Sequence, residues 1–172
     1  KETFLSLRRL TLVPVSQWLQ RQLQQSFFKH TTTQLIYNGI DTNVFSKQTE
    51  VNWIKKKYAI PEPCAIVLGV ASNWYRKGLP DFLQLASLLP PSIRIVLVGL
   101  SKSQQQLAAQ AGIMAINRTD NIQELCALYS AANVYFNPTW EDTFPTTNLE
   151  AMACGTPVVT YKTGGSTEAI TI

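Results

Sequence analysis

AIVLGV-ASNWYRKG-LPDFLQLASLL-PPS-IRIVLV, residues 65–98, is the stretch that decides the fold. Its two ends, Ala65–Val70 and Ile93–Val98, are almost wholly apolar, which is typical of strands buried on both faces of a parallel sheet. Between them, apolar residues recur at helical spacing over Leu79–Leu89, and two prolines then stop the helix. Parallel neighbouring strands need such a crossover, and it is right-handed. The stretch therefore predicts a βαβ unit, with a polar loop, Ser72–Gly78, after its first strand.

The same alternation continues to the end of the chain. Ser101 and Asn121 are suitable caps for two further helices, and Gly155 suits the end of a third. The helices are predicted at 101–111, 122–132 and 145–153, and the strands at 113–116, 134–136 and 158–161. This pattern predicts an α/β fold, a Rossmann-like open parallel sheet with helices on both faces. Ligands of such sheets bind at the carboxyl ends of the strands. We therefore expect three polar loops to converge on one edge, at 71–78, 137–145 and 162–166.

The chain before residue 60 is less regular. Ser16 caps a predicted helix with one apolar stripe, expected to be core rather than a membrane anchor, formed by Trp18, Leu19, Leu23 and Phe27. Leu35–Tyr37 is a predicted short strand, and Asn38-Gly39 is a strong turn signal. A second helix is expected over 51–58, ended by the prolines at 61 and 63.

Composition narrows the classes of protein. The chain has 172 residues, of which 45% are hydrophobic and 15% charged, and its net charge is +4. This is the balance of one soluble globular domain. The basic residues are scattered, without a Lys/Arg-rich arm, which argues against a nucleic-acid partner. No apolar run approaches the roughly 20 residues of a membrane span. The start of the chain has neither a signal-peptide pattern nor an initiator methionine, so we expect it to begin inside a longer protein or at a processing or cloning boundary.

The cysteines and the histidine offer little chemistry. Cys64, Cys126 and Cys154 are widely spaced and lie in apolar stretches, so we expect buried free thiols in a reducing compartment, not disulfides or a zinc site. His30, the single histidine, has no acidic or cysteine neighbour in sequence and is expected at the surface or a helix end.

The loop Ser72–Gly78 carries Arg76 and Lys77 between a predicted strand and helix. A loop that opens a helix presents free backbone N–H groups, and a lysine there can neutralise a phosphate. Taken alone, however, the pair favours two solvated surface charges.

The stretch from Trp140 to Glu150 carries three acidic residues around a predicted helix start. If the helix begins near Pro145, Thr146 and Thr147 occupy its first turn and form an anion site. Asp142 would lie at its mouth, able to accept from sugar hydroxyls. Glu150 lies in a mostly apolar helix, where a carboxylate needs a partner. A ribose diol is one candidate, and a lysine or arginine of the same domain is another.

The third loop reads TGGSTE, residues 163–168. Most Gly-Gly turns only reverse the chain. Glu168 lies near a helix start and is expected to be a first-turn charge, not a ligand.

Together these stretches resemble the family-four retaining glycosyltransferases of GT-B fold. The resemblance covers nearly the whole chain and is strongest over Asn137–Glu168, where NPTWEDTFPTTNLEAMACGTPVV is followed by GGSTE. The family shows an acidic residue, seven positions and then Glu-Ala-Met here. The sequence NGID at 38–41 with Phe45 resembles the family's hinge segment, and VS-WL at 15–19 resembles the last helix of its acceptor lobe. Residues 124–138 also match.

The resemblance implies roles for the candidate residues. Asp142, where the family more often has glutamate, would contact the donor sugar, and Glu150 would hold the ribose hydroxyls. Lys77 matches the family's diphosphate-binding lysine and would act with Asp142 in catalysis. The sugar and phosphate would be met by Phe144, Pro145, Thr146 and Thr147, and the base by the region of Arg118, Thr119 and Asp120.

Two departures from the family pattern affect the phosphate site. The usual arginine before the lysine has no clear match, because Ser72 or Asn73 stands there, and Arg76 would substitute from a different position. Ser72 and Arg76 are therefore included among the expected nucleotide-sugar-binding residues. Pro145 replaces a small residue and removes one N–H donor.

The resemblance also implies a domain organisation. Residues 1–37 would be the end of the acceptor lobe and its linker. Residues 38–172 would be the donor nucleotide-sugar-binding domain, truncated at its C-terminus, and the rest of the N-terminal acceptor lobe would be missing.

The expected function is hexosyl transfer, with retained configuration, from a UDP- or GDP-sugar to a saccharide or lipid-linked acceptor in polysaccharide or glycoconjugate biosynthesis. The protein would need no metal or other cofactor, and the isolated chain would be inactive. The expected location is the cytoplasm, with peripheral contact at the inner face of the membrane. Two alternatives stay open: a non-catalytic nucleotide-binding or partner-binding module, and a GT-B-like nucleotide-sugar 2-epimerase.

Overall fold

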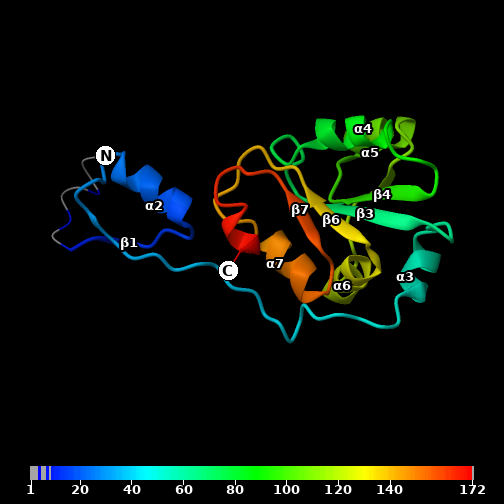
Figure 1. The fold of residues 1–172 in the computed structure, drawn as a ribbon, viewed down its shortest axis with the longest axis horizontal. Coiled ribbons are helices and arrows are strands. Elements are labelled where there is room, and N and C mark those ends of the chain that lie inside the picture. The colour runs from blue at the N-terminus through cyan, green and yellow to red at the C-terminus, as the bar shows by residue number, and fades with distance from the viewer. Residues whose placement is uncertain (1–3, 5–6, 8, 172) are drawn as a thin grey trace.

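The computed structural model describes Phe4, Leu7 and residues 9–171. Residues 9–37, which we call the N-terminal segment, hold a short helix and a two-stranded parallel sheet. These elements lie to one side of a larger sheet, and an extended chain leads from them to it (Figure 1). The elements of the segment are β1 (Thr11–Leu12), α2 (Gln17–Gln24) and β2 (Thr32–Thr33).

The rest of the chain forms a five-stranded parallel sheet in the order β5-β4-β3-β6-β7. Chain order and sheet order reverse between β3 and β6, which is the doubly wound pattern. Helices and strands alternate along the chain, with bounds α3 (Asn52–Lys57), β3 (Ala65–Val70), α4 (Leu79–Ala86), β4 (Ile93–Val98), α5 (Lys102–Gln110), β5 (Met114–Ile116), α6 (Ile122–Ala131), β6 (Val134–Asn137), α7 (Thr146–Ala153), β7 (Val158–Thr160) and the 3-10 turn η1 (Glu168–Ile170). The predicted α/β fold class is confirmed.

Helices cover both faces of this sheet, α4 and α5 one face, and α3, α6 and α7 the other (Figure 1). Alternate residues of each central strand enter different cores: Ile95 and Leu97 pack with α4 and α5, whereas Val96 and Val98 pack with α3 and α6. Burial on both faces is why the strands read as continuous apolar runs. The predicted caps Ser101 and Asn121 also accept hydrogen bonds from the first turns of α5 and α6.

The predicted strand Leu35–Tyr37 is wrong, because the paired residues are Thr32 and Thr33. Backbone bonds continue beyond them, with the Gln34 amide donating to Leu12 O at 2.9 Å and the Ile36 amide to Pro14 O at 3.1 Å. Pro14 has no amide with which to return the bond to Gln34. The two-way hydrogen bonding of a parallel pair therefore ends at Thr33, before the predicted strand begins.

Two predictions of burial are also wrong. The apolar stripe on α2 is only half-buried, because the small N-terminal segment offers little to cover it, and Phe27 lies beyond the helix at 45% exposure. Cys126 and Cys154 are buried free thiols as expected, but Cys64 is half-exposed in the proline-rich turn that precedes β3. Across the described residues, no helix has both the length and the apolar character to cross a membrane.

Candidate functional site

The three polar loops that follow β3, β6 and β7 meet at one edge of the sheet, as predicted. The Trp140 amide donates to Arg76 O at 2.9 Å, which joins the first two loops. The Thr163 hydroxyl donates to Thr139 O at 2.7 Å, and the Gly165 amide donates to Asp142 O at 2.9 Å. The meeting point lies where the strand order reverses, the position at which doubly wound sheets bind ligands.

Two glycines allow these loops to approach so closely. Gly78 has φ +74°, and a Cβ there would lie 2.3 Å from Pro138 O. Gly164 has φ +54°, and its Cβ would lie 2.0 Å from Asp142 O. A side chain at either position would separate the loops, in addition to straining the backbone. The Gly-Gly turn, which is only a weak signal of function in the sequence, therefore forms part of the contact between these loops.

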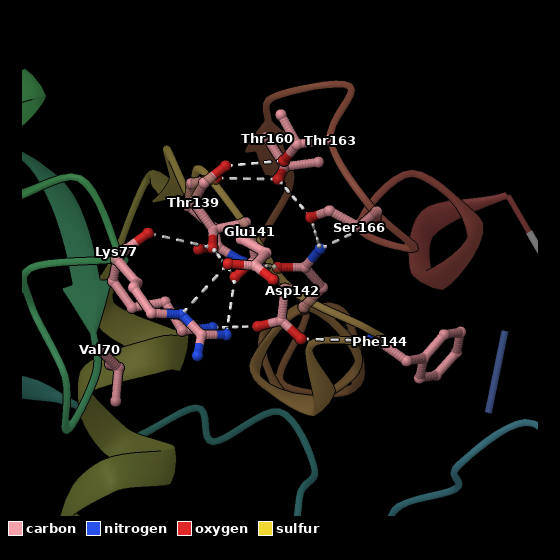
Figure 2. A network of polar contacts seen from close by, with 12 residues as sticks. Val70, Lys77, Thr139, Glu141, Asp142, Phe144, Thr160, Thr163 and Ser166 are labelled. Carbon is pink, nitrogen blue, oxygen red and sulfur yellow. Dashed lines mark hydrogen bonds and ion pairs between the residues drawn. The ribbon is translucent and has the colours of Figure 1, made fainter. Parts of the chain in front are cut away.

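Lys77 and Asp142 form an ion pair at the centre of this edge (Figure 2). Their side chains are 23% and 16% exposed, so the pair is half-buried but open to solvent. The other oxygen of the carboxylate, Asp142 Oδ1, accepts from the Phe144 amide at 3.0 Å. Beside this pair, Arg76 Nε lies 3.9 Å from Glu141 Oε2, and both side chains are largely exposed. Of the two adjacent cations, Lys77 has the less exposed partner.

The helix α7 begins beside this pair. Pro145 is its N-cap residue and no side-chain hydrogen bond caps the helix, so the first turn, with Thr146 and Thr147, presents free amides. The ring of Phe144 points away from the ion pair (Figure 2) and stacks on Tyr37, with ring centroids 5.3 Å apart. Phe144 and Pro145 thus contribute backbone to the site, and the Phe144 ring does not face the pair.

A buried polar contact fixes α7 to the sheet. Asn137 Nδ2 donates to Asn148 Oδ1 at 2.8 Å, and Asn148 Nδ2 donates to Ser166 O at 3.2 Å. Asn148 is fully buried, and it links β6, α7 and the loop after β7. Sequence reasoning missed this residue, although an amide in an apolar helix turn was the available signal.

A cavity of about 440 Å³ opens at the carboxyl ends of β3, β4 and β5. Four of the predicted nucleotide-sugar ligands line it together: Ser72, Arg118, Thr119 and Thr147. The rest of its wall is mainly apolar and comes from Val70, Ala71, Val98, Gly99, Leu125 and the polar Asn117. A mainly apolar cavity with a few polar lining groups suits a small ligand such as a nucleobase.

Glu150 lies one turn along α7 from Thr147, on the same helix face. Its carboxylate accepts from the Tyr129 hydroxyl at 2.9 Å. Burial raises the pKa of Glu150, and bonds from the Tyr129 and Thr146 hydroxyls partly offset this. The prediction that Glu150 needs a partner is confirmed. In the structure the partner is a neutral phenol rather than a lysine or arginine.

A cluster around the buried Glu124, which sequence reasoning missed, is adjacent in sequence to the cavity-lining residues Thr119 and Leu125. Glu124, 4% exposed, pairs with Lys57, accepts from the Tyr58 hydroxyl at 3.1 Å and from the Asp120 amide at 2.8 Å. Lys57 also lies 2.7 Å from the Asp120 carboxylate. These bonds anchor the loop that carries Arg118 to helix α3. The bond from Lys57 lowers the pKa of Glu124.

Known proteins share this architecture. The Anabaena protein Alr3699/HepE in complex with UDP-glucose superposes with a TM-score of 0.80 at 22% identity, over 94% of this chain and 47% of that one. Sucrose-phosphate synthase from Thermosynechococcus elongatus gives a TM-score of 0.77 at 26% identity, over 90% of this chain and 41% of that one. The fold, with its loops meeting at the strand-order reversal, defines a doubly wound domain of the kind that forms one lobe of GT-B glycosyltransferases.

The sequence comparisons give the family. The model of the glycosyl transferases group 1 family matches residues 51–171, and the chain belongs to that family. A D-inositol 3-phosphate glycosyltransferase of Stackebrandtia nassauensis is 31% identical over 151 residues, 77% of this chain and 34% of that protein. An N-acetyl-alpha-D-glucosaminyl L-malate synthase of Bacillus anthracis is 26% identical over 146 residues, 80% of this chain and 37% of that protein. The chain thus spans about a third of the length of these relatives.

Proposed function

We propose that this chain is the donor-binding part of a glycosyltransferase that transfers a hexosyl group from a nucleoside-diphosphate sugar to a saccharide or lipid-linked acceptor. One observation carries the proposal. The Lys77–Asp142 pair, the open start of α7, the Glu150 carboxylate and the cavity lined by Ser72, Arg118, Thr119 and Thr147 all lie at the carboxyl edge of the sheet. In the proposed arrangement the base would lie in the cavity, the ribose at Glu150, the diphosphate at Lys77 and the start of α7, and the sugar at Asp142.

The cavity would hold the base between apolar walls, with Arg118 and Thr119 at its rim. Glu150 would accept from the ribose hydroxyls, because a carboxylate bonded only to neutral donors keeps its charge available. Lys77 and the amides of Thr146 and Thr147 would meet the diphosphate. Asp142 would orient the sugar by accepting from its hydroxyls.

In the transfer, the bond between the anomeric carbon and the diphosphate oxygen breaks, and its electron pair leaves with the nucleoside diphosphate. In the proposed donor position, Lys77 and the positive end of α7 would lie where this charge develops and would stabilise the departure. The acceptor hydroxyl oxygen forms the new bond to the anomeric carbon, and its proton passes to the departing diphosphate. By family resemblance, the configuration is retained and no metal ion in the protein takes part. Residues 1–37 would belong to the acceptor lobe and its linker, and residues 38–172 to the donor domain.

The test is calorimetric titration of the chain with UDP-sugars and GDP-sugars, beside Glu150→Ala. We expect saturable binding for one base class, weakened at least about tenfold in the variant, since a hydrogen bond to a charged group contributes about 1.5–3 kcal/mol. Glu62→Ala removes an exposed carboxylate paired with Lys55 and serves as the control. A folded chain that binds no nucleotide sugar, or binds it equally well in both variants, would argue against the proposal.

A further inference from the structure

Glu168, on η1, contacts the N-terminal segment from the far end of the chain. Its Oε2 accepts from the Gln17 amide at 2.7 Å, and its Oε1 accepts from the Trp18 amide at 2.8 Å. These are the first free amides of α2, where the helix dipole favours a carboxylate. The Ser16 side chain accepts from the next amide, that of Leu19, at 3.1 Å. A residue 150 positions away thus completes the cap of α2.

This cap continues into the candidate donor site. Ser16 is fully buried, and a Cβ on Gly165 would lie 2.8 Å from Ser16 Cβ, so the loop between β7 and η1 lies directly against the start of α2. The Gly165 amide donates to Asp142 O at 2.9 Å. Asp142 in turn pairs with Lys77. One line of contacts therefore runs from the α2 helix through this loop to the ion pair.

Tyr37 provides a second route between the same two regions. Its hydroxyl donates to Glu168 Oε2 at 3.1 Å, and its ring stacks on Phe144. The Phe144 amide donates to Asp142 Oδ1 at 3.0 Å. Both routes end on Asp142, one at its backbone carbonyl and the other at its carboxylate.

We propose that Glu168 is a positioning residue that couples the docking of the N-terminal segment to the placement of Asp142. The helix α2 buries none of its own residues, so its attachment depends on polar bonds at its first turn. Where the segment is docked, Glu168 holds the loop 162–168 against Asp142. Where it is released, the loop and Asp142 lose that support. The effect on sugar transfer rests on the proposed function, whereas the coupling itself does not.

The test is residue-resolved amide hydrogen exchange on the chain and on Glu168→Ala. We expect the Gln17 and Trp18 amides to exchange about tenfold faster in the variant, the scale of a lost helix cap. The Gly165 and Phe144 amides should also exchange faster, by a smaller factor, although neither bonds to Glu168. Tyr37→Phe, which removes one of three donors to the carboxylate, should give a fraction of each effect. Glu50→Ala, an equal change of charge at an exposed residue, should give none.

Three outcomes would overturn the proposal. Unchanged exchange at Gln17 and Trp18 would refute the cap. Faster exchange there with unchanged Gly165 and Phe144 would refute the coupling. Equal acceleration of the Leu97 amide, in the central strand β4, would show a loss of global stability instead of a local release. Donor titration separates the two proposals: a wild-type chain that binds no nucleotide sugar would count against the proposed function, while the exchange pattern still decides the coupling.

Discussion

Glu124 and Glu150 are carboxylates on the packed neighbouring helices α6 and α7, and they differ in what surrounds the charge. Glu124 pairs with Lys57 and accepts hydrogen bonds from the Tyr58 hydroxyl and the Asp120 amide. Among the residues that the structure describes, the side chains that donate hydrogen bonds to Glu150 are the hydroxyls of Tyr129 and Thr146. The pKa of Glu124 is therefore lowered, whereas burial raises the pKa of Glu150.

The difference separates a structural carboxylate from one that is available to a ligand. The charge of Glu124 is compensated within the protein, and its bonds hold the loop whose residues Asn117, Arg118 and Thr119 line the cavity. The charge of Glu150 is not compensated by a cation, so further donors, such as a ribose diol, would stabilise it. Burial alone does not distinguish the two; the identity of the partners does.

The largest expected effect is on thermal stability. Glu124→Gln removes the charge that holds Lys57 and weakens the bonds to Asp120 and Tyr58, so we expect Tm to fall by about 5 °C or more at neutral pH. Glu150→Gln removes a poorly compensated charge and should leave Tm unchanged or raise it slightly. Thermal unfolding followed by circular dichroism measures both. An equal fall in the two variants would remove the distinction between them.

For donor affinity we expect the opposite order, with the larger effect from Glu150→Gln. We expect Glu150→Gln to weaken nucleotide-sugar binding by about tenfold, because an amide accepts less strongly than a carboxylate and offers one oxygen instead of two. Glu124→Gln should change affinity by less than about threefold, since its bonds act on the loop and not on the ligand. Calorimetric titration at one pH and ionic strength gives both values. A larger loss for Glu124→Gln would show that the loop it anchors is the main determinant of binding.

Glu150 and Glu124 should affect stability over different pH ranges. Because the pKa of Glu150 is raised in the fold, its ionisation destabilises the protein as pH rises above the ordinary glutamate value of 4.5. The difference in Tm between wild type and Glu150→Gln should change above that pH. The pKa of Glu124 is lowered, so its stabilising contribution is complete above the ordinary value and is lost as pH falls below it. The difference for Glu124→Gln should therefore change below 4.5. Melting curves across this range test both, and overlapping windows would contradict the assigned directions.

Sequence reasoning predicted the parts of the fold that local patterns determine. The bounds of Ala65–Val70 and Ile93–Val98 match β3 and β4, because burial on both faces leaves a continuous apolar run. The caps at Ser101 and Asn121 involve bonds three residues away, so they too leave a local signal. The convergence of the three loops followed from the topology of parallel sheets.

The contacts that sequence reasoning missed join residues far apart in the chain. Glu124 and Lys57 are separated by 67 positions, and Glu168 and Trp18 by 150. Neither pairing affects hydropathy or helix periodicity, so Glu168 was read as an ordinary first-turn charge. Glu150 was found because it interrupts an apolar helix. The sequence thus indicates that a buried charge needs a partner, but only the fold identifies that partner.

The smallest expected effect concerns the hydroxyl that Glu150 accepts from. Tyr129→Phe removes the 2.9 Å bond to Glu150 while keeping the buried ring. Without this donor the pKa of Glu150 should rise further, since the bond partly offsets desolvation. At a given pH the ionised fraction of the carboxylate would then be smaller than in the wild type, and donor affinity should fall by about twofold to fivefold. The fall should diminish as pH rises, because the carboxylate regains its charge. Titrations of Tyr129→Phe at two pH values measure this, and a loss of affinity that does not depend on pH would mean that the hydroxyl orients Glu150 without controlling its charge.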